Sequence, residues 1–96
     1  MSLPSYSLST IKKDIRSGNY FITNSARVNS IAIGFDAEDI KEIGLNLIES
    51  DFYKTMGSEK FLTRMQDVYR TEYRGIQVYY KVQITNRTII ISCKEL

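Results

Sequence analysis

Three short phrases in the second half of the chain place cationic side chains beside tyrosines and amides. They are Asp51-Phe-Tyr-Lys-Thr-Met56, Gln66-Asp-Val-Tyr-Arg70 and Gln77-Val-Tyr-Tyr-Lys81, followed by Ser92-Cys-Lys-Glu95. Lysine and arginine can hold a phosphate, tyrosine can donate a proton or stack on a base, and glutamine can hydrogen-bond. These residue types on one surface suit the binding of a phosphate backbone and the stacking of bases.

The composition restricts the class of protein. A chain of 96 residues with ordinary apolar and charged fractions predicts one soluble globular domain, residues 1–96. No apolar run approaches the roughly 20 residues of a membrane span, and the first residues do not resemble a signal peptide. The single cysteine, Cys93, fits a reducing compartment. We therefore expect a cytoplasmic protein with no membrane partner.

The composition also restricts the chemistry. Because the chain has no histidine and one cysteine, zinc sites of the ordinary type and a histidine-based triad are excluded. No metal or cofactor is expected. The net charge of +2 is uneven, since residues 1–50 carry five basic and six acidic side chains and residues 51–96 carry eight and five. This asymmetry is compatible with chance or with a basic binding half, and charge alone does not decide between them.

The first half of the chain has helical periodicity. One helix is predicted to end at Gly18, a second to begin at Thr23 or Asn24 and continue to about residue 33, and a third to run from Asp36 to residue 48, with a short edge strand at residues 20–22. The side chains expected to face inward are Leu8, Ile11 and Ile15 in the first helix and Ile40, Ile43, Leu47 and Ile48 in the third. In the second helix Ala26, Val28 and Ile31 are expected to lie partly inward.

From Asp51 the hydrophobic period changes to two, which predicts strands with turns at Gly57-Ser58 and Asn86-Arg87. The strand residues expected to be buried are Ile76, Val78, Val82, Ile89 and Ile91. Helices followed by strands favour an α+β domain, with helices packed on one face of a mainly antiparallel sheet and a polar face left open. The residues expected on this open face are Gln66, Arg70, Tyr79, Lys81 and Lys94, with Lys54 on a neighbouring strand.

The phrases "SDFYKTM", "QDVYR", "QVYYK" and "SCKE" resemble those of the MqsR family of bacterial toxins, and "LSTIKKDIRSGNY", "TNSA" and "GFD" agree in outline. The resemblance runs from about residue 8 to residue 96. It implies a RelE-like fold and an mRNA interferase, an endoribonuclease that cleaves single-stranded mRNA at GC-containing sites and is restrained by a cognate antitoxin. The catalytic positions that it implies are Lys54, Gln66, Tyr79 and Lys94, with Arg70 and Met56 as substrate-binding neighbours.

The residue types permit a metal-free mechanism through a 2′,3′-cyclic phosphate. A base must take the 2′-hydroxyl proton, an acid must protonate the leaving 5′-oxygen, and cations must stabilise the phosphorane. Either Lys54 or Lys94 serves as the base, with the other and Arg70 holding the phosphate. Tyr79 is the acid or a positioning group, Gln66 hydrogen-bonds, and Lys81 adds diffuse attraction to RNA.

Two other readings of the same residues remain open. One is a non-catalytic RNA-binding domain, which uses the basic and aromatic sheet face without turnover. The other is a protein-interaction module whose exposed strands contact only a protein partner. The absence of histidine slightly favours both, whereas the lysine, tyrosine and glutamine positions favour the enzyme.

Overall fold

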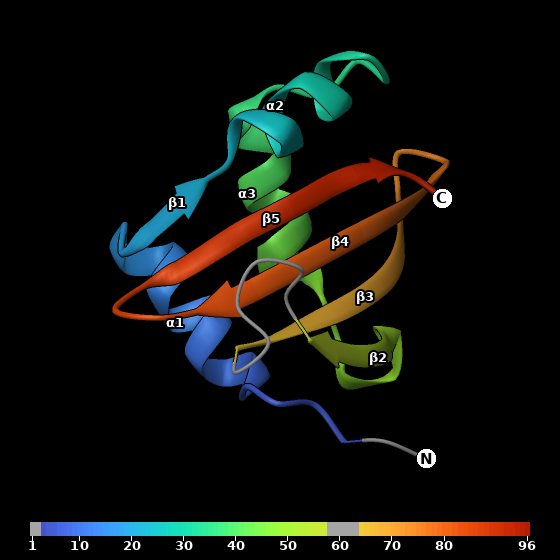
Figure 1. The fold of residues 1–96 in the computed structure, drawn as a ribbon. Helices are drawn as coiled ribbons and strands as arrows, with labels where there is room; N and C mark the ends of the chain where they lie inside the picture. The colour runs from blue at the N-terminus through green and yellow to red at the C-terminus, as the bar shows by residue number, and fades with distance from the viewer. Residues whose placement is uncertain (1–2, 58–63) are drawn as a thin grey trace.

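The computed structural model describes residues 3–57 and 64–96 and confirms an α+β fold (Figure 1). In chain order the elements are α1 (Leu8–Ser17), β1 (Tyr20–Ile22), α2 (Asn24–Ile31), α3 (Ala37–Asn46), the short 3-10 turn η1 (Glu49–Asp51), β2 (Phe52–Gly57), β3 (Met65–Tyr73), β4 (Ile76–Ile84) and β5 (Thr88–Glu95). The strands form one sheet in the order β1-β5-β4-β3-β2, antiparallel except that β1 runs parallel to β5.

The helices lie against one face of this sheet, and α1 and α3 cross behind β4 and β5 in the view of Figure 1. The predicted inward stripe of α1 is confirmed, since Leu8, Ile11 and Ile15 are buried. Gly18 ends this helix with a positive φ of 82°, a conformation that glycine adopts at little cost. In the described part of the chain, no helix has the length and apolar character that a bilayer crossing requires.

Two parts of the helical prediction are wrong. Val28 and Ile31 of α2 are 55% and 68% exposed, because Ala26 and Ser30, one turn apart, form the buried face instead. The Ser30 hydroxyl donates a hydrogen bond to the carbonyl oxygen of Cys93 in β5. The third helix ends at Asn46, before the predicted boundary. The backbone is extended from Leu47, so Ile48 no longer follows the helical stripe and is 57% exposed.

Strand β4 has the predicted alternation, with Val78, Tyr80 and Val82 fully buried. Tyr80 reaches α3 and donates a hydrogen bond from its hydroxyl to the carbonyl oxygen of Ile40 at 2.9 Å. A Cβ atom on Gly44 would lie 2.7 Å from that hydroxyl oxygen. Glycine at this position therefore allows the close approach of α3 to β4.

The predicted inner face of β5 is wrong in its first half. Thr88 and Ile90 are buried there, whereas Ile89 and Ile91 are half-buried, as is Ile76 at the start of β4. The cause is a bulge in β5, because Lys81 pairs with Ser92 while the next residue, Val82, pairs with Ile90. Beyond this bulge Cys93 faces the core, as predicted. The run of three isoleucines carries no period-two signal that could have located the bulge.

The turns are confirmed where the structure describes them. Asn86-Arg87 lies in the short loop between β4 and β5, whereas Ser58 of the predicted Gly57-Ser58 turn lies outside the described residues. The turn between β3 and β4 is formed by Arg74 and Gly75, whose φ angles of 51° and 80° match the twist of a tight hairpin.

The segment before α1 is held to β3 by a buried carboxylate. Asp67 accepts hydrogen bonds from the backbone N–H groups of Ser5 and Tyr6, at 3.0 and 2.9 Å. The Tyr6 hydroxyl donates to the carbonyl oxygen of Met65 at 2.6 Å. These bonds fix the start of β3. Gln66 lies between Met65 and Asp67, the two residues that accept them.

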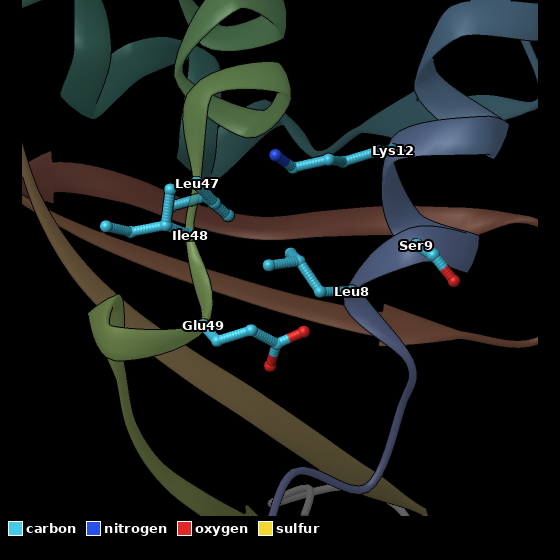
Figure 2. A pocket seen from close by; sticks show the side chains of 6 residues that line it. All are labelled: Leu8, Ser9, Lys12, Leu47, Ile48 and Glu49. Atoms are coloured by element: carbon cyan, nitrogen blue, oxygen red, sulfur yellow. The ribbon is translucent and has the colours of Figure 1, made fainter.

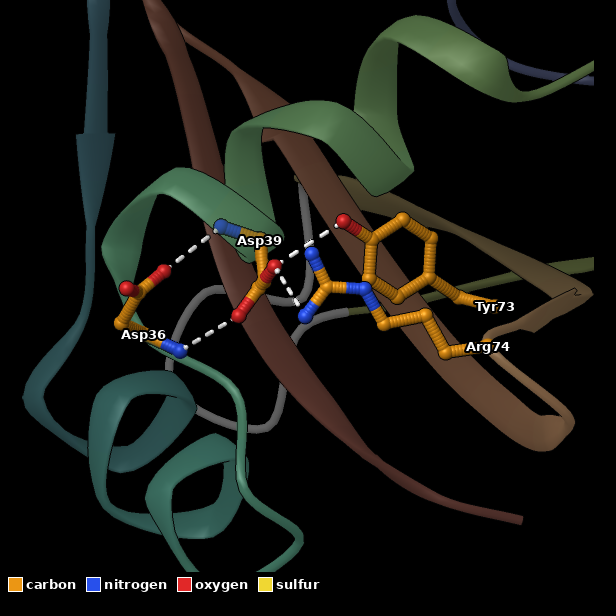
Figure 3. Close-up of polar contacts among 4 residues, drawn as sticks. All are labelled: Asp36, Asp39, Tyr73 and Arg74. Carbon is orange, nitrogen blue, oxygen red and sulfur yellow. Dashed lines mark hydrogen bonds and ion pairs between the residues drawn. The ribbon is translucent and has the colours of Figure 1, made fainter.

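A second carboxylate joins α3 to the hairpin between β3 and β4 (Figure 3). Asp36 and Asp39 form a capping box, in which each side chain accepts from the backbone N–H of the other at 3.0 Å. Asp39 also accepts from the Tyr73 hydroxyl at 2.9 Å and forms an ion pair with Arg74 at 3.2 Å. The pKa of Asp39 is lowered, mainly by the Asp36 backbone hydrogen bond and further by Tyr73 and Arg74, although burial opposes them.

We predict that Asp39→Asn destabilises the protein at neutral pH. Its single carbonyl oxygen cannot replace both carboxylate oxygens, of which one accepts from the Asp36 backbone and the other from Tyr73, and the amide has no charge to pair with Arg74. Because the folded-state pKa is lowered, the stability from this carboxylate is present above its unfolded pKa of 3.8 and is lost as the pH falls through the folded value. The melting-temperature gap between variant and wild type, measured by circular dichroism, should therefore narrow below about pH 4.

Glu38→Gln is the matched control, because Glu38 is an exposed carboxylate in the same turn of α3. It should leave the melting temperature nearly unchanged. A melting-temperature difference between Asp39→Asn and wild type that stays constant from neutral to acid pH would contradict the stabilising role of the ionised carboxylate.

Candidate functional site

The open face of the sheet carries side chains from four strands in rows that follow the strand register. One row contains Arg70, Tyr79 and Lys94, since Arg70 pairs with Tyr79 and Tyr79 pairs with Lys94. The next contains Lys54, Val68, Lys81 and Ser92 in the same way. A third begins with Met56 and Gln66. The structure therefore places every residue of the predicted site on this face.

Direct contacts join the first row to Lys54. The Lys94 ammonium lies 5.0 Å from the centre of the Tyr79 ring, within the range of a cation–π interaction. The Arg70 guanidinium lies 3.5 Å from the centre of the Tyr53 ring, and the Lys54 ammonium lies 5.5 Å from the same ring. Lysine and arginine from three strands thus surround two tyrosines.

Tyr53 is a member of this cluster that sequence reasoning did not select. In a regular strand it would point away from Lys54, on the opposite face. The register of β2 shifts between Phe52 and Lys54, and this bulge allows the Tyr53 ring to contact both Lys54 and Arg70. The available sequence signal for Tyr53 was its position next to Lys54 in the phrase Asp51-Phe-Tyr-Lys-Thr-Met56.

The protonation of Tyr79 is influenced by its surroundings. Burial of the half-buried ring raises its pKa, the nearby Arg70 guanidinium lowers it, and Tyr53 raises it further, with a raised pKa as the result. The phenol therefore keeps its proton at neutral pH and can donate it. Arg70 can only stabilise negative charge, because a guanidinium does not lose its proton in proteins.

Gln66 differs from the other members of the predicted site, because its side chain is only 7% exposed. Its Nε2 atom donates a hydrogen bond to Oε1 of Gln83 at 3.1 Å, and Gln83 is also buried. Gln66 and Arg70 are four residues apart in β3, or about 13 Å along the strand. The site is thus elongated, with the cationic cluster at one end and the two glutamines at the other.

A separate hollow of about 320 Å³ lies among the helices, and Figure 2 shows its lining. It is formed by Leu8, Ser9, Lys12, Leu47, Ile48 and Glu49. These residues belong to α1 and to the segment after α3, so the hollow lies on the side of the sheet that the helices cover. Its lining is mainly apolar, and the open face remains the stronger candidate for chemistry. The described residues include no group of three or more histidine, cysteine or acidic side chains placed to hold a metal ion.

Comparisons with known proteins agree with this geometry. Residues 3–95 match the family described as "motility quorum-sensing regulator, toxin of MqsA". The chain belongs to this family. It is also 37% identical, over 92 residues, to the mRNA interferase toxin MqsR of Escherichia coli (strain K12), a match that covers 96% of this chain and 94% of the relative.

Family membership confirms the resemblance inferred from the four phrases. All four lie on the sheet, with the first in η1 and β2 and the others in β3, β4 and β5. The individual roles of the seven predicted site residues stay predictions. The two contacts that sequence reasoning did not include, those of Tyr53 with Arg70 and of Gln83 with Gln66, enlarge the set of residues to be tested.

We predict that Arg70→Gln raises the pKa of Tyr79 further, because it removes the positive charge that favours the phenolate. The titration can be followed by nuclear magnetic resonance of ring-labelled tyrosine, with the signal assigned from Tyr79→Phe. Arg74→Gln is the control, since Arg74 contacts Tyr73 instead. A lower pKa of Tyr79 in Arg70→Gln, or an equal shift in both variants, would show that the guanidinium does not act on this phenol.

Proposed function

We propose that this protein is the toxin of a type II toxin–antitoxin pair and acts as an mRNA interferase, an endoribonuclease that cleaves single-stranded mRNA. The name of the Escherichia coli relative supports this activity. The observation that carries the proposal in this chain is the row of Arg70, Tyr79 and Lys94, joined to Lys54 through Tyr53. This row combines a proton donor with several cations on an open surface.

The proposed reaction begins with attack of a 2′-hydroxyl on the adjacent phosphorus. Lys54 or Lys94, in its neutral form, takes the hydroxyl proton, and the other lysine binds the phosphate with Arg70. The 2′-oxygen forms its bond to phosphorus, and the bond to the 5′-oxygen breaks. Tyr79 protonates the departing oxygen or hydrogen-bonds the phosphate. The products are a 2′,3′-cyclic phosphate and a 5′-hydroxyl, and the charges are balanced without a metal ion.

The open face also suits a single-stranded substrate. A sheet face with exposed aromatic and cationic side chains can contact the RNA backbone and stack unpaired bases, which a duplex does not present. Tyr53 is 46% exposed although Arg70 stacks on it, so part of its ring remains available. We infer from the family resemblance that cleavage prefers GC-containing sites, that a cognate antitoxin restrains the enzyme, and that it acts in the cytoplasm to inhibit translation and growth.

We predict that the purified protein cleaves single-stranded RNA in the presence of EDTA, and that Tyr79→Phe slows cleavage about 10²-fold because it removes the hydroxyl alone. Single-turnover rates on a labelled RNA, with end-group analysis of the fragments, give both results. Lys81→Ala is the comparison, since loss of a lysine that contributes only diffuse attraction to RNA should have a smaller effect, which added salt removes.

Expression without the antitoxin should arrest bacterial growth.

The possible outcomes separate the functions. Discrete fragments with cyclic phosphate ends support the enzyme, whereas a mobility shift without cleavage supports a non-catalytic RNA-binding domain. If the protein neither cleaves nor binds RNA, the result supports a protein-interaction module. Strict dependence on a divalent metal would contradict the mechanism, and equal small effects of Tyr79→Phe and Lys81→Ala would contradict the catalytic assignment of Tyr79.

We predict that Tyr53→Leu lowers the cleavage rate about 10-fold, within the range for losing a cation–π contact in a site, because the Arg70 guanidinium then lacks the ring that holds it. Tyr53→Phe keeps the ring and should cleave nearly as fast as wild type. The ratio of the two rates isolates the stacking. Should the phenylalanine variant be as slow as the leucine variant, the Tyr53 hydroxyl and not the stack would be the important group.

A further inference from the structure

One further row of the open face lies beyond Arg70 and Tyr79. Glu72 of β3 pairs with Gln77 of β4, and each is two residues along its strand from a member of the Arg70–Tyr79 pair. Both side chains therefore lie on the open face, and both are exposed. The backbone of Gln77 is also held by β5, since its carbonyl oxygen accepts from the Leu96 N–H at 2.9 Å. Two strand residues span about 7 Å, so this row lies beside the proposed site of cleavage.

The hydrogen bond within this pair has one possible direction. The Gln77 Nε2 atom donates to Oε1 of Glu72 at 3.0 Å. An ionised carboxylate accepts hydrogen bonds and donates none, so the glutamine amide bonds to it only through its NH₂ group. The bond uses one Glu72 oxygen and one Gln77 N–H. The remaining groups of the pair are two acceptor oxygens and one N–H donor, all on an exposed surface.

The charge of Glu72 distinguishes this row from the rest of the open face. The adjacent row holds Arg70 and Lys94, and the row after that holds Lys54 and Lys81. A phosphate is attracted to these cations, whereas the Glu72 carboxylate repels it. A base is uncharged and can approach the carboxylate through its N–H groups. The row of Glu72 and Gln77 is therefore suited to a base and not to the RNA backbone.

We propose that Glu72 and Gln77 form a subsite that binds the Watson–Crick edge of an unpaired guanine beside the cleaved bond. Guanine is the one RNA base with donors on two neighbouring atoms of this edge, N1–H and the 2-amino group, beside the acceptor O6. The pair offers two acceptors and one donor, which match these groups in number and kind. This inference rests on the proposed function and names two residues that recognise part of the substrate.

Base analogues test the subsite with the protein unchanged. The cleavage site is first mapped on a labelled single-stranded RNA, and each guanosine near it is replaced in turn by inosine, which lacks the 2-amino group. We expect one position at which inosine lowers kcat/KM about 10-fold, the effect of losing one hydrogen bond to a charged group. At that position 7-deazaguanosine, which keeps the Watson–Crick edge, should be cleaved as fast as guanosine. Equal cleavage of the guanosine and inosine RNAs at every position would overturn the proposal.

Substitutions then assign this preference to the pair. Glu72→Gln keeps the side-chain shape but loses the charge and one acceptor, so the ratio of kcat/KM for guanosine over inosine should fall from about 10 toward 1. Gln77→Met removes the amide and should also lower the ratio. Glu95→Gln is the matched control, because Glu95 is an exposed carboxylate that pairs with Val78 and follows Lys94, so it points to the other face.

The ratio compares two RNAs on the same variant, so a general change in RNA affinity caused by the lost charge cancels. Glu95→Gln should keep the wild-type ratio. A ratio that is unchanged in Glu72→Gln, or that falls equally in Glu95→Gln, would overturn the subsite.

A binding measurement separates this proposal from the proposed function. A short RNA analogue with one guanosine and 2′-fluoro sugars throughout has no 2′-hydroxyl and cannot be cleaved. By fluorescence anisotropy, it should bind more tightly than its inosine counterpart to the wild-type protein and equally to Glu72→Gln. This result, with no cleavage of ordinary RNA, would reject the proposed function alone. Cleavage of RNA without a guanosine preference that depends on Glu72 would reject the subsite alone, and absence of RNA binding would reject both.

Discussion

Burial of Tyr80 against α3 determines the orientation of the whole open face. Its ring is fully enclosed and its hydroxyl bonds to the backbone of Ile40, an approach that Gly44 makes possible. Because successive strand residues point to opposite faces, fixing Tyr80 inward turns Tyr79 and Lys81 outward. A slip of one residue would bury a lysine and expose the core, so the hydrophobic packing on the helical side enforces the position of the polar residues on the other.

The ladder then carries that orientation to the neighbouring strands. Tyr79 aligns Arg70 on β3 and Lys94 on β5, because both residues are its register partners. Two bulges modify the pattern at the outer parts of the site. In β5 the bulge reverses the alternation before Cys93, and in β2 it brings Tyr53 beside Arg70. Regular strand pairing thus aligns Arg70, Tyr79 and Lys94, and the bulge in β2 adds the contact of Tyr53 with Arg70.

The sequence predicted the features that depend on clear periodicity. The alternation around Tyr80 and the spacing of Ile11 and Ile15 each allow one buried face, and the structure confirms them. Prediction was wrong at Ile91, where consecutive isoleucines fit either phase, and at Val28, since hydrophobicity alone does not identify the packed side of a short helix. In the candidate site, alternation and family phrases together indicated the face. The bulge at Tyr53 and the Gln66–Gln83 hydrogen bond depend on three-dimensional contacts that no local pattern encodes.

The pairing of β1 with β5 has a consequence for synthesis on the ribosome. The earliest strand of the sheet to be translated has the latest as its partner, and Asp67 must appear before the backbone of Ser5 and Tyr6 is bound. These contacts join residues more than sixty positions apart, so local segments cannot complete the sheet in advance. A nascent chain that lacks β5 also lacks Lys94 and the row that contains it. Assembly of a surface proposed to cleave messenger RNA is thus deferred until the ribosome has read nearly all of the segment that encodes it.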